Sequence, residues 1–279
     1  MSRDISVSDV PRHHSSLSDG FRAEIATRNI AAPVAVVWFM TTALVTGATA
    51  GIGYAIATEL ARRGVDVIVH GRDAERGNKV VQEIENAGGS AKLVAADLAD
   101  VDDVGRLARA AGDVDILVNN AGIYSFADTV ETTDEQYEAQ FGVNVRAPFI
   151  LVRELAPGMA ARGEGAIVNI TTVVATTPGA GAGVYGATKA ALELFTKVWA
   201  DEFGKSGVRV NAVSPGPTAT PGTTGIPGLL DGLAGTRALR RVAQPEEIAQ
   251  VVAFLTSRDA SYVNGAIVPV DGGALGLSA

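Results

Sequence analysis

A glycine-rich turn near residue 50 constrains the fold of this 279-residue chain more than any other feature. It lies between a short apolar run and a stretch of helical periodicity, and it reads Thr46-Gly47-Ala48-Thr49-Ala50-Gly51-Ile52-Gly53. Glycines let a backbone turn tightly and approach a pyrophosphate, which binds at a helix N-terminus. Glycines in this position can also serve a plain strand–helix turn, and the spacing differs from the usual G-x-G-x-x-G. We favour a dinucleotide site that includes Gly47, Thr49, Gly51, Ile52 and Gly53.

The rest of the chain alternates between candidate strands and helices. The strands are short apolar runs at Ala43–Thr46, Asp66–His70, Ala91–Ala95, Ile116–Asn119, Ala166–Ile170, Arg209–Val213 and Ala266–Pro269. The helical stretches are Ile52–Arg63, Glu75–Ala87, Val101–Ala111, Thr133–Arg162 (interrupted near Pro148 or Pro157), Val184–Phe203 and Pro245–Thr256. Unbroken apolar strands that alternate with helices predict an α/β fold, with a doubly wound parallel sheet covered by helices on both faces.

Two segments fall outside this pattern. Residues 1–39 are polar at first and lack a clean period, so we expect a poorly ordered N-terminal extension before one domain at 40–279, with Met40 as a possible true start. The apolar segment Ile30–Val45 contains Pro33 and is too short for a membrane-spanning helix. A stretch rich in Pro, Gly and Thr predicts a substrate loop or lid at about 217–240.

Composition excludes several classes of function. The net charge of -8 and the lack of any Lys/Arg-rich run argue against nucleic-acid binding. The absence of cysteine excludes disulfides, iron–sulfur clusters and thiolate zinc sites, and it is compatible with a cytoplasmic location. His13, His14 and His70 show no metal-ligand spacing, so no metal site is predicted.

The segment after the second strand bears on cofactor choice. An acidic residue here usually holds the ribose hydroxyls of NAD, but this chain has Gly71-Arg72-Asp73. The Arg72 guanidinium can pair with a 2′-phosphate, which favours NADP(H). Asp73 could still turn toward a ribose, so NAD(H) stays possible.

A tyrosine and a lysine four residues apart, Tyr185 and Lys189, begin a helical stretch. This spacing places the phenol and the ammonium on one face of a helix. A free tyrosine titrates near pH ~10, and a nearby positive charge lowers that pKa toward the range of a useful acid/base. Taken alone, the pair could equally be a helix-capping tyrosine and a solvated lysine.

The motifs together are more specific than any one of them. Thr46–Gly53, Asn119–Gly122, Asn144, Tyr185 with Lys189, and Pro215-Gly216 occur in the order that resembles the short-chain dehydrogenase/reductase family. The resemblance runs from about Thr41 to Gly273. It implies a single Rossmann-like domain with a seven-stranded parallel sheet, and a homotetramer or dimer built around the long helix Val184–Phe203.

The resemblance also implies roles for individual residues. Tyr185 would be the catalytic acid/base, Lys189 would lower its pKa and hold the nicotinamide ribose, and Asn144 would support a proton-relaying water. At the cofactor, Asp97 and Leu98 would lie near the adenine. The other expected cofactor contacts are Asn120, Ala121, Gly122, Pro215, Gly216, Thr218 and Thr220. Thr172 replaces the serine usual in the family, keeping a hydroxyl donor but narrowing the pocket with its methyl.

These residues predict hydride transfer between NADP(H) and a carbonyl or secondary alcohol, for example a 3-oxoacyl thioester. An NAD-dependent alcohol or sugar dehydrogenase is an alternative. A non-catalytic dinucleotide sensor is another, although Tyr185 and Lys189 are retained. Substrate walls are expected from Val173–Gly181, Ile123–Phe126 and the loop 217–240. These walls are mostly small and apolar, with Arg237, Arg240 and Arg241 near the end of the loop, so we expect an apolar or weakly anionic carbonyl substrate.

Overall fold

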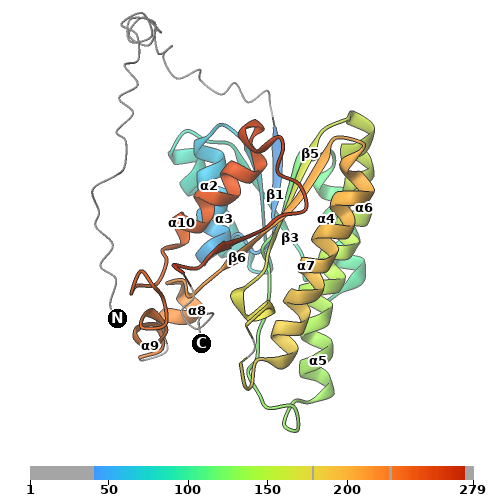
Figure 1. Ribbon diagram of the computed structural model, residues 1–279. Coiled ribbons are helices and arrows are strands. Elements are labelled where there is room, and N and C mark those ends of the chain that lie inside the picture. Colours follow the sequence, from blue (N-terminus) through green and yellow to red (C-terminus); the bar gives the residue numbers. More distant parts are fainter. Residues whose placement is uncertain (1–40, 178, 226–227, 274–279) are drawn as a thin grey trace, which may run out of the picture. The chain divides into compact units, whose positions relative to one another are not determined.

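The computed structural model describes residues 41–177, 179–225 and 228–273 (Figure 1). The predicted extension 1–39 and the proposed start at Met40 lie outside the described residues. Among the described helices, none combines the length and the apolar character that crossing a membrane requires.

Seven parallel strands form one sheet in the order β3-β2-β1-β4-β5-β6-β7. Their bounds are β1 Thr42–Val45, β2 Asp66–Gly71, β3 Ala91–Ala95, β4 Ile116–Asn119, β5 Gly165–Ile170, β6 Val208–Pro215 and β7 Ile267–Val270. The chain winds outward from β1 to β3 and then crosses to β4, so the strand order reverses between β1 and β4. Ligands of open α/β sheets bind at such a switch point, beyond the carboxyl ends of the strands.

Helices cover both faces of the sheet (Figure 1). One face carries α2 (Gly51–Arg62), α3 (Ala74–Asn86) and α10 (Pro245–Thr256), and the other carries α4 (Val101–Ala111), α6 (Ala147–Arg162) and α7 (Gly183–Gly204). The strands alternate between these two cores. Ala43 and Val45 pack toward α2 and α10, whereas Leu44 packs toward α4, α6 and α7. Each strand is therefore buried on both sides, as its unbroken apolar run predicts.

The doubly wound seven-stranded fold is confirmed, and the predicted strand and helix ends agree with the structure to within two residues, with one exception. The helical stretch Thr133–Arg162 is not interrupted at a proline. It divides into α5 (Asp134–Phe141) and α6, joined by η1 (Gly142–Arg146), a π-helical turn. Pro148 lies in the first turn of α6, where the missing N–H has no intrahelical partner to lose, and α6 continues through Pro157.

The segment 217–240 is less irregular than predicted. It contains two short helices, α8 (Pro221–Thr224) and α9 (Leu229–Ala234). Two 3-10 turns complete the described elements, η2 (Val173–Ala175) after β5 and η3 (Arg258–Ala260) after α10.

Candidate active site

The glycine-rich turn has a backbone that only glycine adopts easily. Gly47 and Gly51 have φ angles of 64° and 56°, in the left-handed region. A Cβ on Gly53 would lie 2.2 Å from the Gly47 carbonyl oxygen and 2.3 Å from Asn120 Nδ2. The turn therefore packs directly on the segment that follows β4, without room for a side chain between them.

Thr46 and Asn120 join these two segments. The Thr46 hydroxyl donates to the Val118 carbonyl at 3.1 Å and accepts from the backbone N–H groups of Asn120 and Ala121 at 2.9 and 3.0 Å. The Asn120 amide donates back to the carbonyls of Thr46 and Gly47 at 2.8 and 3.2 Å. Asn120 thus braces the glycine-rich turn with its side chain. From the sequence, Asn120 was expected only as a cofactor contact, and Thr46 had no role of its own.

His70 is a further residue that sequence reasoning missed. Its Nδ1 accepts from the backbone N–H of Gly47 at 3.2 Å, so the proton sits on Nε2, which lies 3.2 Å from the Ala96 carbonyl oxygen. The ring is 2% exposed, and burial lowers the pKa of His70 to about 4. A neutral imidazole therefore connects the glycine-rich turn to the end of β3. The only sign of this role in the sequence is a histidine near the end of a predicted buried strand.

Two arginines and two aspartates line the part of the cleft that follows β2 and β3. Arg72 and Arg76 are exposed and both line the cleft beside the glycine-rich turn. Asp73 caps α3, because its carboxylate accepts from the Arg76 backbone N–H at 3.0 Å and from Arg76 Nε at 2.7 Å. This pairing lowers the pKa of Asp73. The carboxylate weighed as a ribose ligand is thus engaged with α3, and Arg76 adds a cation that the sequence analysis did not consider.

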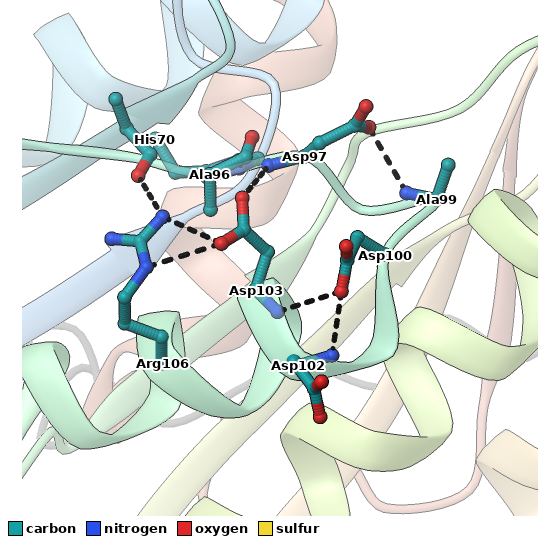
Figure 2. Close-up of polar contacts among 9 residues, drawn as sticks. His70, Ala96, Asp97, Ala99, Asp100, Asp102, Asp103 and Arg106 are labelled. Atoms are coloured by element: carbon teal, nitrogen blue, oxygen red, sulfur yellow. Dashed lines mark hydrogen bonds and ion pairs between the residues drawn. The ribbon is translucent and has the colours of Figure 1, made fainter.

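Asp97 lies in a well-braced turn at the end of β3 (Figure 2). Its backbone N–H donates to Asp103 Oδ2 at 2.9 Å, and its own Oδ1 accepts from the Ala99 N–H at 3.0 Å. Arg106 fixes Asp103 from the other side at 2.9 Å and donates to the Ala95 carbonyl at 3.0 Å. These bonds hold the Asp97 side chain at the wall of the cleft, where the resemblance places the adenine.

A cleft of about 390 Å³ runs along the carboxyl ends of β1, β2 and β4. Twelve of the predicted cofactor residues line this cleft, namely Gly47, Thr49, Gly51, Ile52, Gly53, Arg72, Asp97, Leu98, Asn120, Ala121, Gly122 and Thr220. The helix behind it, α2, has neither a side-chain cap nor an acidic residue in its first turn. Its free N-terminal amides, the glycines and the two arginines fit the phosphates of a dinucleotide.

Gly122 connects this cleft to the residues expected to be catalytic. A Cβ on Gly122 would lie 3.2 Å from Lys189 Nζ and 3.3 Å from Asn144 Oδ1. The Lys189 side chain is buried, and its ammonium donates to the Ile170 carbonyl, the last residue of β5, at 2.9 Å. The structure therefore brings Lys189 and Asn144 together at the end of the cofactor cleft.

Tyr185 lies in the first turn of α7, and its phenol lies beside the hydroxyl of Thr172, which follows β5. The expected acid/base and the hydroxyl donor that replaces the usual serine are thus adjacent. Burial raises the pKa of Tyr185 to about 12, against a smaller lowering by the Thr172 side chain. Burial also lowers the pKa of Lys189 to about 8.

The direction of the tyrosine shift is opposite to the expectation. Sequence reasoning paired the phenol with a nearby ammonium, but Lys189 directs its ammonium to a backbone carbonyl, and desolvation dominates both groups. A buried neutral phenol is suited to donate a proton to a carbonyl oxygen.

Asn144 takes its position from the π turn η1. Its Nδ2 donates to the Ile123 carbonyl at 2.8 Å and to the Thr188 hydroxyl at 3.1 Å, and its Oδ1 accepts from the Ile123 N–H at 2.9 Å. Asn144 therefore fixes the backbone of Ile123 from both directions, in addition to standing beside Lys189.

The remaining predicted cofactor residues lie after β6. Thr218 donates to the Gly216 carbonyl at 3.0 Å, which closes the turn after Pro215. Thr220 packs on the glycine-rich turn, because a Cβ on Gly51 would lie 3.2 Å from its side chain. Thr220 lines the cleft, whereas Pro215, Gly216 and Thr218 are not among its lining residues.

A parallel sheet of this order, with a glycine-rich cleft at its switch point and a buried tyrosine–lysine pair, defines a dinucleotide-dependent oxidoreductase. A family model described as enoyl-(acyl carrier protein) reductase matches residues 47–274. A solved structure described as a short chain dehydrogenase/reductase family protein is 53% identical, with a TM-score of 0.79, and the match covers 84% of this chain and 96% of that chain. The chain belongs to the short-chain dehydrogenase/reductase family and is an NAD(P)-dependent enzyme.

Two relatives indicate the range of substrates among similar proteins. Cyclopentanol dehydrogenase from Comamonas sp. is 37% identical over 237 residues, which are 82% of this chain and 95% of that protein. The 3-oxoacyl (acyl-carrier-protein) reductase of Agrobacterium tumefaciens C58, solved with NADP bound, is 32% identical with a TM-score of 0.80. That match covers 84% of this chain and 93% of the reductase.

Proposed function

We propose that the protein is an NADP(H)-dependent reductase of ketones, or the corresponding secondary-alcohol dehydrogenase. The observation that carries this proposal is the adjacency of the Tyr185 and Thr172 hydroxyls at the end of β5, next to the Lys189 ammonium and the cofactor cleft. When bound, the reduced dinucleotide supplies a hydride to the carbonyl carbon.

The side chains of the protein supply the proton and the orientation. Thr172 donates a hydrogen bond to the carbonyl oxygen, and Tyr185 releases its hydroxyl proton to the same oxygen. Lys189 supports the cofactor ribose and the charge that forms on Tyr185. Asn144 holds Ile123 and stands beside Lys189, where a water can carry the replacement proton.

The preference for NADP(H) over NAD(H) rests on Arg72 and Arg76. Both guanidinium groups line the adenine end of the cleft, and a 2′-phosphate is a natural partner for them. Asp73 is engaged as the cap of α3, which disfavours the ribose contact that NAD requires. The NADP bound to the Agrobacterium tumefaciens reductase agrees with this preference.

Two wider predictions belong to the same proposal. The protein is a homo-oligomer, a tetramer or dimer built on α7, and exposed apolar side chains on that helix, Leu194 and Val198, support this assembly. A cytoplasmic location remains a prediction from the cysteine-free composition.

The test is a fluorescence titration with NADPH and NADH, repeated on Arg72→Ala and, as a matched control, on Arg109→Ala in the last turn of α4. We expect NADPH to bind more tightly than NADH, and Arg72→Ala to weaken NADPH alone by about tenfold, since a charge-assisted hydrogen bond contributes roughly 1.5–3 kcal/mol. An NADH preference that Arg72→Ala leaves unchanged would refute the cofactor assignment. Tight binding without turnover of any ketone or alcohol would instead indicate the non-catalytic sensor.

A further inference from the structure

Two aromatic rings, those of Tyr124 and Phe126, pack against the phenol ring of Tyr185. The ring centroids of Tyr124 and Phe126 lie 5.9 and 6.2 Å from that of Tyr185, and 5.5 Å from each other. Both rings meet Tyr185 in edge contacts, at interplanar angles of 61° and 82°. Yet Tyr124 is 46% exposed and Phe126 is 62% exposed, so neither ring belongs to a core. Tyr124 and Phe126 form an open aromatic wall beside the reacting hydroxyl.

The backbone builds this wall by alternation. In the segment after β4, every second residue is anchored through its backbone N–H. Ile123, Ser125 and Ala127 donate to Asn144 Oδ1, Gln140 Oε1 and the Gly181 carbonyl at 2.9, 3.4 and 2.9 Å. Tyr124 and Phe126 are the residues between these anchors, and both of their rings contact the ring of Tyr185.

One bond also ties the wall to the substrate loop. The Tyr124 hydroxyl donates to the Gly222 carbonyl of α8 at 3.1 Å, and a Cβ on Gly222 would lie 2.9 Å from that hydroxyl. The polar tip of Tyr124 is thus occupied by the protein. What this ring offers to a ligand is its apolar face.

Over the described residues, the charged side chains of the cleft lining come from segments other than the one that carries the wall. The lining residues Ile123, Val143, Thr220, Pro221 and Gly222 are uncharged. The charged lining residues, Arg72, Asp73, Arg76 and Asp97, follow β2 and β3, whereas the wall follows β4.

The arginines that suggested a weakly anionic substrate each contact another part of the protein, although Arg237 Nε is buried without a hydrogen-bond partner. Arg237 lies 3.9 Å from the Asp271 carboxylate, Arg241 lies 2.7 Å from Glu247, and Arg240 donates to the Gly235 carbonyl. Of the two substrate characters expected from the sequence, these contacts favour the apolar one.

We infer that the substrate is a neutral ketone or alcohol carried on a ring, whose face packs on Tyr124 and Phe126 while its oxygen reaches Tyr185 and Thr172. Flat rings gain stacking and edge contacts from aromatic side chains that a flexible chain of equal size does not. Among the described lining residues that follow β4, an acyl chain on a phosphate-bearing carrier finds no cation. The inference rests on the proposed function and narrows its substrate class.

The test compares two ketones with the same number of carbons, the bicyclic aryl ketone α-tetralone and the linear 2-decanone, with acetoacetyl-CoA as the anionic thioester. NADPH oxidation gives kcat/KM for each on the wild type, Phe126→Ala, Phe126→Leu and Tyr124→Phe. Tyr262→Ala removes a fully exposed ring elsewhere and is the matched control. Urea unfolding verifies that each variant is folded.

We expect the wild type to prefer α-tetralone by about tenfold or more. Phe126→Ala and Phe126→Leu should abolish most of this preference, whereas Tyr124→Phe and Tyr262→Ala should retain it. Equal values for the two ketones, a preferred thioester, or an equal loss for both ketones in Phe126→Ala would overturn the inference.

Failure of the proposed function has a different signature, in which NADPH binds but neither ketone is reduced. Calorimetric titration of the two ketones into the enzyme saturated with NADP⁺ then decides the inference separately. Tighter binding of α-tetralone that depends on Phe126 supports it, and equal binding refutes it.

Discussion

Replacing Thr46 with valine tests whether one buried hydroxyl holds the cofactor site together. The substitution preserves the shape of the side chain but removes the acceptor for the Asn120 and Ala121 N–H groups, which lie 2.9 and 3.0 Å from the hydroxyl. It also removes the donor to Val118. The Asn120 N–H also donates to the Val118 carbonyl at 3.1 Å, so the Ala121 N–H is the donor that loses its partner. A buried donor left without a partner costs about 1–3 kcal/mol, which is the expected loss in the free energy of unfolding.

Urea unfolding measures this loss, and Thr46→Ser is the matched control. Thr46→Ser retains all three hydrogen bonds and loses only one methyl group, which is worth about 1 kcal/mol. Thr46→Val should also loosen the segment after β4, whose Asn120 side chain braces the glycine-rich turn. We therefore expect the affinity for NADPH to fall in this variant. If Thr46→Val proves as stable as Thr46→Ser and binds NADPH equally well, the hydroxyl does not organise the site.

Two further predictions concern the same turn. Gly53→Ala should destabilise the protein by about 1–3 kcal/mol and abolish tight NADPH binding, because its Cβ would lie 2.2 Å from the Gly47 oxygen. Gly105→Ala in α4, where the Cβ meets only the flexible Arg109 at 3.3 Å, should instead leave binding intact and increase stability slightly in urea unfolding. The pKa of His70 is lowered to about 4 in the folded protein. Between about pH 4 and 6.5, His70 therefore binds fewer protons in the folded state than in the unfolded chain. Its contribution to the free energy of unfolding is present at pH 7 and is lost as the pH falls. Unfolding at pH 7 and 4.5 should show about 2–3 kcal/mol more loss in the wild type than in His70→Gln, and identical losses would contradict the buried, neutral assignment of His70.

The fold could be predicted from the sequence because it depends on local patterns. Short apolar strands, helical periodicity and one glycine-rich turn were enough to predict the sheet and most element ends. The break in the helical stretch 133–162 was misplaced because a π turn has no strong local signal, whereas prolines do. In the structure, Pro148 occupies a tolerant first-turn position and Pro157 lies within α6.

The candidate site was predicted less completely, because its supports are distant in sequence. Thr46 bonds residues more than seventy positions away, and His70 connects two different loops. The role weighed for Asp73 changed for a similar reason, since the carboxylate is engaged by Arg76 on the following helix. The shift of Tyr185 depends on burial, which a motif of two residues does not encode.

The segment after β4 shows why the site works as a unit. Its first residue, Asn120, holds the glycine-rich turn, and Gly122 leaves space for Lys189. The next residues are fixed by Asn144 and present the aromatic wall to Tyr185. Because this segment begins at the switch point of the sheet, we expect a single stretch of backbone to set the distances between the cofactor, Tyr185 and the proposed substrate ring. A shift of the glycine-rich turn should therefore reach the substrate wall, so Gly53→Ala should reduce ring selectivity as well as cofactor affinity.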